Sequence, residues 1–318
     1  MLFLYSIKII SLQERFNCIN SNYMETKMKK VAVLYIALGR YIVFWKDFYE
    51  SCEKYLGPCE KHYFVWTDNN NFDYCSNSNV TVISAKKMGW PYDTLLRFKM
   101  FLQEEKTLKK FDYIYFFNAN MKFINPVDLA EIIPQEWHDG LVAGIHPGRW
   151  GDIWINEVDK FPYERRPEST AYVPVGKGKH YGCGAFNGGT SKDFLKMCHV
   201  LAKNIDKDLK NKIVAVVDDE SHLNAYLVNK KYLLCGRAYG FPEGKLKHVS
   251  DLEMPMIKII SRHKDDPKYG GVKWLRGQTD KKIRNTWFVR NVLQKACRLI
   301  AIFIPIQKWR RKVRNLYG

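Results

Sequence analysis

The stretch VAVLYIA, which runs from Val31 to Ala37, decides the fold class of this chain. It is a continuous apolar and β-branched run closed by Gly39, and such a run is typical of a strand that is buried on both faces of a parallel sheet. A helix should follow it, because apolar residues recur at four-residue intervals between Tyr41 and Tyr55, ahead of a Gly57-Pro58 stop. The segment therefore predicts the first strand and helix of a βαβ unit.

The alternation of strands and helices continues toward the middle of the chain and then loosens. Strands are predicted at residues 62–66, 80–84 and 113–117, and a second helix at residues 95–108. Beyond residue 126 the sequence is rich in aromatic residues and glycine, notably at 161–174 and 182–189, and such long irregular stretches are usually binding loops. Helical spacing resumes at residues 195–205 and 220–229. We therefore expect an α/β fold with a central, mostly parallel sheet.

Composition bounds the class of protein. The chain has 318 residues, of which 46% are hydrophobic, so it can bury one large core or two modest ones. Its formal charge of +18 indicates attraction to phosphate in a nucleotide, a lipid surface or a nucleic acid. Residues 281–318 hold eleven basic and no acidic residues, which leaves +7 for residues 1–280. The excess of positive charge therefore lies mostly in the C-terminal segment.

This C-terminal segment, residues 281–318, is predicted to be a basic amphipathic helical tail. Apolar residues recur at three- or four-residue steps from Ile283 to Leu316, with an interruption near Pro305, and basic residues occupy the other faces. The apolar run at residues 299–306 is too short to span a bilayer. We expect the tail to lie on an anionic membrane surface; an ordinary helix docked on the main domain has the same pattern.

Residues 1–28 are interpreted as a poorly defined N-terminal extension. The opening run MLFLYSIKII is too short for a membrane span and lacks a small-residue cleavage site, so we expect no secretory signal. The eight cysteines are scattered without a CxxC pair, which favours a reducing compartment. These features predict a cytoplasmic protein whose main domain covers residues 29–280.

Polar residues follow the strand predicted at residues 113–117, where the sequence reads Asn118-Ala119-Asn120. In open α/β sheets ligands bind beyond the carboxyl ends of the strands, so the two asparagines are candidates for contact with a nucleotide or a sugar. Asparagine also ends strands for structural reasons, because it tolerates turn geometry. Spacing alone leaves both interpretations open.

Blocks of the sequence, taken in order, resemble glycosyltransferase family six over about residues 29–276. They are YIA at 35–37, FWKDFY at 44–49, WTD at 66–68, GWP at 89–91, TLLRF at 94–98, FFNAN at 116–120, HPG at 146–148, YERR at 163–166, AYVP at 171–174, GG at 188–189, DESHLN at 219–224 and KYGG at 268–271. The resemblance implies a GT-A type nucleotide-sugar transferase fold for a catalytic domain at residues 29–280. It also implies a retaining α-1,3-transferase that moves galactose or N-acetylgalactosamine from UDP-Gal or UDP-GalNAc to a β-galactoside-type oligosaccharide or glycolipid acceptor.

The resemblance also assigns roles to individual residues. It implies that Glu220 lies beneath the reacting anomeric carbon, where a carboxylate stabilises an oxocarbenium-like transition state or attacks it. An acidic helix start would contain the same residues for purely electrostatic reasons. The implied donor-binding residues are Ile36, Ala37, Leu38, Tyr41, Asp68, Arg97, Asn118, Ala119, Asn120, Cys183, Gly184, Ala185, Asp219 and Lys264. The implied acceptor-binding residues are His146, Pro162, Glu220 and Glu243.

No metal or other cofactor is expected, because the animal members of the family have Asp-x-Asp where this chain has Asn118-Ala119-Asn120. Neutral amides are poor ligands for a hard cation, which needs several charged oxygens. Amides can still hydrogen-bond the ribose or the donor sugar. The leaving UDP must then be neutralised by protein cations, and Lys264 and Arg97 are the matching candidates.

Three features concern specificity. Asp218 stands where the family usually has a histidine, and Pro162 where it has a threonine, so the acceptor is left open. The resemblance implies that donor choice follows the bulk of residues 183–185, but a single methyl contributes only about 1–3 kcal/mol to such discrimination, so the donor is left open as well. The arginines at 165 and 166 can be phosphate ligands or members of structural ion pairs.

We predict a metal-independent hexosyltransferase at the inner face of the cytoplasmic membrane, active in surface-glycan synthesis. The alternative is a non-catalytic carbohydrate-binding relative, against which the retention of Asp219 and Glu220 argues. Nucleic-acid binding is not expected, because the basic tail has no recognised RNA- or DNA-binding motif.

Overall fold

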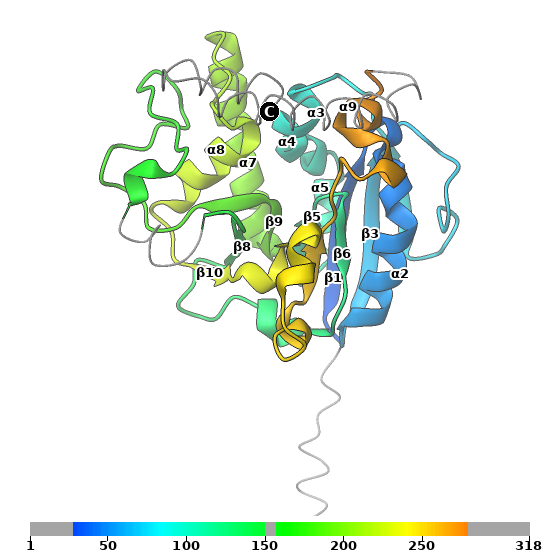
Figure 1. The fold of residues 1–318 in the computed structure, drawn as a ribbon. Helices are drawn as coiled ribbons and strands as arrows, with labels where there is room; N and C mark the ends of the chain where they lie inside the picture. Colours follow the sequence, from blue (N-terminus) through cyan, green and yellow to red (C-terminus); the bar gives the residue numbers. More distant parts are fainter. Residues whose placement is uncertain (1–27, 150–156, 279–318) are drawn as a thin grey trace, which may run out of the picture.

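The computed structural model describes residues 28–149 and 157–278, which are arranged around a seven-stranded sheet (Figure 1). The strand order is β10-β8-β9-β5-β1-β3-β4. Strand β9 runs antiparallel to β5 and β8, whereas the other neighbouring strands pair in parallel. The strands are β1 (Lys30–Ala37), β3 (Glu60–Thr67), β4 (Val80–Ser84), β5 (Tyr113–Phe117), β8 (Leu141–Ile145), β9 (Gly182–Thr190) and β10 (Tyr232–Cys235). The predicted α/β fold with a mostly parallel central sheet is confirmed.

Strand β1 is buried on both faces, as its unbroken apolar sequence predicts. Residues 31–35 are completely buried. The odd-numbered residues of this stretch share a core with α2 (Trp45–Tyr55), and the even-numbered ones share a second core with α4 (Arg97–Phe101) and α7 (Ser191–Lys210). Successive side chains of a strand point to opposite faces, so a strand between two layers of helices needs apolar residues at every position.

The predicted helices are present but are divided differently. The segment at 41–55 starts as the 3-10 helix η1 (Gly39–Phe44) and becomes α-helical in α2. The segment at 95–108 is split, because Leu96 departs from helical backbone angles and Arg97 turns toward β9, where its Nη1 donates a hydrogen bond to the Gly184 carbonyl. The pieces are α3 (Tyr92–Leu95), α4, η2 (Leu102–Glu104) and α5 (Glu105–Leu108). The later predicted helices correspond to α7 and α8 (Asp218–Leu227).

The glycine-rich segment at residues 182–189 lies in strand β9, so the expectation of an irregular binding loop there is wrong. A Cβ at Gly188 would lie 2.3 Å from Tyr115 Cδ1, and a Cβ at Gly189 would lie 2.1 Å from the Gly140 carbonyl oxygen. Gly189 also has a φ angle of +147°, which other residues rarely adopt. The glycines that suggested a loop therefore allow β9 to fit closely between β5 and β8.

A second, three-stranded sheet joins the segment after β5 to the C-terminal part of the domain. Strand β12 (Ile259–Ser261) pairs antiparallel with β6 (Met121–Phe123) and parallel with β11 (Phe241–Pro242). The turn that ends at Asn120 therefore lies beside the segment that begins at Arg262. Shorter elements are β2 (Leu56–Gly57), β7 (Val127–Asp128), η3 (Leu129–Ile132), η4 (Val158–Lys160), η5 (Arg237–Tyr239), η6 (Glu243–His248), η7 (Met254–Met256), η8 (Pro267–Tyr269) and α9 (Gly271–Leu275).

Two predicted regions fall outside the described residues: the N-terminal extension up to residue 27 and the basic tail at residues 281–318. Within residues 28–149 and 157–278, no helix is long and apolar enough to cross a membrane. The association of the tail with a membrane therefore stays a prediction.

Candidate active site

A cavity of about 380 Å³ lies at the carboxyl ends of β1 and β5, beside the start of α8. This is the edge at which open α/β sheets bind their ligands. Most of the predicted site residues line it, although they come from positions 36 to 264 of the chain: Ile36, Leu38, Tyr41, Arg97, Asn118, Ala119, Asn120, His146, Cys183, Gly184, Ala185, Asp219, Glu220 and Lys264. The fold thus brings the predicted donor and acceptor residues to one place.

Four predicted site residues do not line the cavity: Ala37, Asp68, Pro162 and Glu243. Ala37 is buried within β1. Asp68 Oδ1 accepts a 2.8 Å hydrogen bond from the backbone N–H at position 39, and Glu243 Oε2 accepts a 3.0 Å bond from the N–H at position 263. These two carboxylates hold the loops that precede Tyr41 and Lys264.

The start of helix α8 supplies two carboxylates to the cavity. Asp219 is buried, and its Oδ2 lies 3.1 Å from Arg97 Nη2. Glu220 Oε2 accepts a 2.6 Å hydrogen bond from the backbone N–H of Gly184 on β9. The preceding residue, Asp218, has a φ angle of +41°, a strained conformation for a residue with a Cβ. Such strain persists where the surrounding structure fixes the backbone, and here it fixes the residues that enter the cavity.

Burial changes the acidity of both carboxyls. It raises the pKa of Asp219 to about 7, although the charge of Arg97 opposes the shift. It also raises the pKa of Glu220, against the opposing hydrogen bond from Gly184. A poorly solvated carboxylate interacts strongly with positive charge that develops nearby. The arrangement is therefore suited to stabilising a cationic transition state.

The two asparagines after β5 are bonded to each other and to the segment after β12. Asn118 Nδ2 donates a 3.1 Å hydrogen bond to Asn120 Oδ1. Asn120, which is buried, donates from Nδ2 to Ser261 Oγ (3.1 Å) and to the Arg262 carbonyl (2.8 Å). These residues do not fit a divalent metal, because amides bring no charge and the Asn120 amide is committed to holding residues 261–262.

Four basic side chains among the described residues line the cavity: Lys87, Arg97, Lys264 and Arg276. The Nζ of Lys264 lies 5.6 Å from the centre of the Tyr41 ring. Burial, together with the charges of Arg276 and Arg97, lowers the pKa of Lys264 to about 8. A bound anion would offset the mutual repulsion of these cations, so the cavity is electrostatically suited to phosphate groups.

Sequence reasoning assigned no role to several lining residues, among them Lys87, Trp90 and Arg276. The guanidinium carbon of Arg276 lies 3.9 Å from the centre of the Trp90 ring, and Lys87 Nζ donates a hydrogen bond to the Arg276 carbonyl. Trp90 belongs to the GWP block, which indicated the family resemblance without indicating a contact. Neither spacing nor periodicity signals a pairing between residues 87–90 and residue 276.

The YERR arginines form structural contacts, which decides between the two interpretations left open above. Arg166 Nε and Nη2 donate to the two carboxylate oxygens of Glu164 at 2.9 and 2.6 Å. Glu164 is buried and also accepts a 2.9 Å bond from the Val216 N–H, while Arg166 donates to the Val214 carbonyl. Arg165 donates to the carbonyls of residues 173 and 174. The Glu164–Arg166 pair therefore braces the loop that leads into α8.

A mostly parallel α/β sheet, with carboxylates and cations around a cavity at its carboxyl edge, is compatible with the GT-A type fold of transferases that use nucleotide sugars. The sequence profile of Glycosyltransferase family 6 matches residues 13–300. The chain belongs to glycosyltransferase family 6.

Curated relatives agree with this assignment. The O-antigen biosynthesis glycosyltransferase WbnI of Escherichia coli is 34% identical over 76% of this chain and 99% of its own length. The globoside alpha-1,3-N-acetylgalactosaminyltransferase 1 of Gallus gallus is 30% identical over 67% of this chain and 61% of its own length. The histo-blood group ABO system transferase 1 of Rattus norvegicus is 30% identical over 63% and 57%. The chain thus spans about three fifths of the length of these animal relatives. It is a hexosyltransferase that uses a nucleotide-sugar donor and a glycan acceptor.

Proposed function

We propose that this protein transfers galactose or N-acetylgalactosamine from UDP to the 3-position of a β-galactoside-type acceptor, with retention of the anomeric configuration. The observation that carries the proposal is the position of Glu220, whose carboxylate lines the cavity and is held by the Gly184 N–H. The name of the Gallus gallus relative describes an α-1,3 transfer of N-acetylgalactosamine, which supports the linkage.

Glu220 is the catalytic residue in this proposal. Its partly buried carboxylate stabilises positive charge at the anomeric carbon as UDP departs, or attacks that carbon so that two inversions give retention. Asp219, whose Oδ2 lies 3.1 Å from Arg97 Nη2, accepts hydrogen bonds from the hydroxyls of the donor sugar. Arg97 also donates a 2.6 Å hydrogen bond to the carbonyl of Gly184, the residue whose N–H holds Glu220. Asp219 and Glu220 are therefore both positioned by contacts that involve Arg97 and Gly184.

We propose further that transfer needs no divalent metal. The charge of the departing UDP is then balanced by Lys264, Lys87 and Arg276, while Arg97 is engaged with Asp219. Asn120 is committed to residues 261–262, so the donor contact of the Asn118-Ala119-Asn120 turn falls to Asn118. Transfer should survive EDTA.

Donor choice is proposed to depend on residues 183–185 of β9. A Cβ at Gly184 would lie 3.2 Å from Asp219 Oδ2 and 3.3 Å from Glu220 Oε2, so a side chain there would press on both carboxylates. Ala185 lines the cavity with a methyl group, and Cys183 lines it with a thiol. The room beside these two side chains decides whether an acetamido group fits.

The acceptor is proposed to be an oligosaccharide or a glycolipid, bound on the His146 side of the cavity. We also propose that the chain works at the inner face of the cytoplasmic membrane through its tail at residues 281–318, whose eleven basic residues suit an anionic leaflet. Removal of these residues is expected to release the protein from anionic vesicles. Unchanged co-sedimentation of the shortened protein would exclude the tail as the anchor.

The test of the reaction is an assay of the purified protein with UDP-Gal and UDP-GalNAc against a panel of β-galactosides in EDTA, with the anomeric configuration of the product read by NMR. Glu220→Gln should lose most turnover while retaining UDP binding, because the amide keeps the shape but not the charge. Glu253→Gln, which alters an exposed glutamate outside the cavity, is the matched control. Full turnover in Glu220→Gln would remove this residue from the mechanism, and sugar binding without UDP release would indicate a carbohydrate-binding protein.

A further inference from the structure

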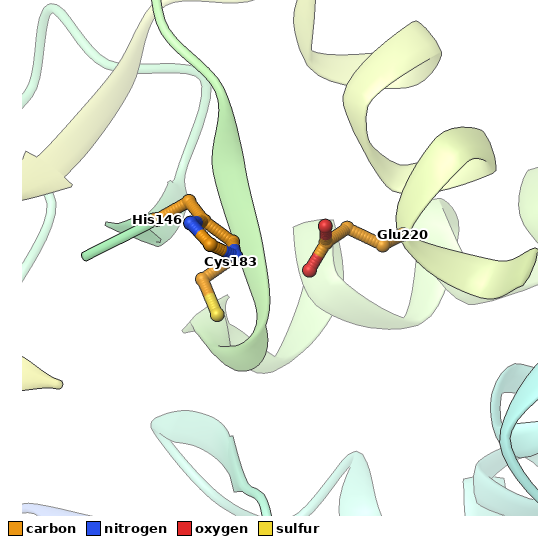
Figure 2. Close-up of side chains that lie close together, drawn as sticks. All are labelled: His146, Cys183 and Glu220. Carbon is orange, nitrogen blue, oxygen red and sulfur yellow. The ribbon is translucent and has the colours of Figure 1, made fainter. Parts of the chain in front are cut away.

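Three side chains of different chemistry converge on one point of the cavity (Figure 2). His146 follows β8, Cys183 lies on β9, and Glu220 lies in the first turn of α8. One ring nitrogen of His146, the Sγ of Cys183 and one carboxylate oxygen of Glu220 all lie within 4.8 Å of one another. Figure 2 shows the Glu220 carboxylate directed toward the other two side chains.

This donor set has a clear preference among metal ions. Imidazole, thiolate and carboxylate are ligands for Zn²⁺ and for the similar Co²⁺, whereas Mg²⁺ and Ca²⁺ prefer oxygen alone. Three protein ligands with an open fourth position are typical of accessible zinc sites. All three side chains are partly exposed and line the cavity, so an ion can reach them from solvent.

The geometry needs only small adjustments. Neighbouring ligand atoms in a tetrahedral zinc site lie about 3.5 Å apart, and side-chain rotations can close the remaining gap. Glu220 can keep its hydrogen bond from Gly184, since a carboxylate offers several lone pairs. His146 Nδ1 accepts a 3.2 Å bond from the Gly148 N–H, which an ion at Nδ1 would displace and an ion at Nε2 would leave in place.

We propose that His146, Cys183 and Glu220 form a binding site for Zn²⁺ or a similar borderline metal ion, and that occupancy of this site blocks sugar transfer. The second part rests on the proposed function: the ion would ligate the Glu220 carboxylate and fill the space beside Cys183 that the donor sugar requires.

The surroundings limit the strength of this site. Burial raises the pKa of the Cys183 thiol to about 12, so binding must release a proton from sulfur. The positive charges of Arg97 and Lys264 oppose a divalent ion, although they also favour the thiolate. We therefore expect reversible binding that EDTA removes, unlike that of a structural zinc site.

The first test uses Co²⁺ as a spectroscopic probe of the full chain, because a thiolate ligand to Co²⁺ gives a charge-transfer band in the near ultraviolet. The parent protein and Cys75→Ser, which removes a half-exposed cysteine elsewhere, should show the band. Cys183→Ser should lose it, and the affinity for Co²⁺ should fall at least about tenfold, as should that of His146→Asn. Absence of the band in the parent, or its persistence in Cys183→Ser, would overturn the site.

The second test measures sugar transfer as Zn²⁺ is added, each variant being compared with its own zinc-free rate. Transfer by the parent should stop and return with EDTA, and Cys183→Ser should need at least about tenfold more Zn²⁺. The two proposals fail separately. A thiolate band without any transfer supports the metal site and overturns the proposed reaction. Transfer without the band supports the reaction and overturns the metal site. Transfer that Zn²⁺ does not inhibit, in a protein that shows the band, would overturn the inhibitory role.

Discussion

The substitution Asn120→Asp tests how the turn after β5 supports the cavity. The Asn120 amide donates to Ser261 Oγ and to the Arg262 carbonyl, and a carboxylate can donate to neither. Each lost neutral hydrogen bond costs about 1 kcal/mol, and leaving the Arg262 carbonyl against a buried carboxylate adds about 1–3 kcal/mol. The expected loss in the free energy of unfolding is therefore about 3–5 kcal/mol. In a domain of this size that lowers the midpoint of thermal unfolding by roughly 10 °C.

The same substitution should weaken UDP binding. Asn120 fixes the backbone two residues before Lys264, so the cation loses its place when the amide is replaced. A charge-assisted hydrogen bond contributes about 1.5–3 kcal/mol, which corresponds to at least about tenfold in the dissociation constant for UDP measured by calorimetry.

Asn125 provides a matched control at the opposite end of the β6–β12 pair. Its Nδ2 donates to the carbonyls of Met254 and Ile257 at 3.0 and 2.8 Å. Asn125→Asp should therefore lower the unfolding midpoint to a similar extent while leaving UDP affinity unchanged, because Asn125 does not line the cavity. The reasoning fails if Asn120→Asp unfolds at the parental temperature at pH 7, or if both variants lose UDP affinity equally.

Three further outcomes follow from the cavity and its supports. Because the pKa of Lys264 is lowered to about 8, its charge is lost as pH rises, and kcat/KM in EDTA should fall about tenfold from its plateau to pH 9. Lys264→Arg should flatten this fall at alkaline pH, and an unchanged fall in the variant would show that Lys264 does not cause it. Arg166 lowers the pKa of Glu164 to about 2, so their ion pair stabilises the protein above the ordinary glutamate pKa, and this stabilisation is lost as pH falls through about 2. Glu164→Gln should lower both kcat and the midpoint of thermal unfolding at pH 7 while the affinity for UDP stays constant. An unchanged kcat would show that the Glu164–Arg166 pair only stabilises the fold. Ala185→Gly should raise the ratio of kcat/KM for UDP-GalNAc to that for UDP-Gal by about 5- to 100-fold, and a constant ratio would place the acetamido group elsewhere.

The sequence predicts the central part of the fold well, because a strand that is buried on both faces needs apolar residues at every position. The run at residues 31–37 and the run at 113–117 are apolar at every position, and both are strands of the main sheet. The glycine-rich strand β9 was missed because glycine signals both a loop and a close approach of strands. Only the positions of Tyr115 and Gly140 in space distinguish these two causes.

The candidate site was predictable where the family blocks supplied it and unpredictable where distant segments meet. Glu220, Asn118 and Lys264 came from matched positions and do line the cavity. The stacking of Arg276 on Trp90 depends on how α9 sits against the segment before α3, and no local pattern encodes that contact. Glu243 lies at a matched position as well, yet its carboxylate is used by the backbone of residue 263.

The charges of the cavity connect the asparagine turn to the proposed absence of a metal. Arg97 is held by Asp219 and by the Gly184 carbonyl, so it is not free to balance a diphosphate. Lys264, Lys87 and Arg276 then remain as positive groups that line the cavity. Two carboxylates at positions 118 and 120 would pair with these cations and withdraw them from the leaving group, whereas two amides leave their charge available. The neutral amides at positions 118 and 120 are therefore compatible with a cavity whose charge is supplied by lysine and arginine. Replacing both asparagines by aspartate, with the lysine and arginine residues kept, should lower turnover and should not make it dependent on Mn²⁺.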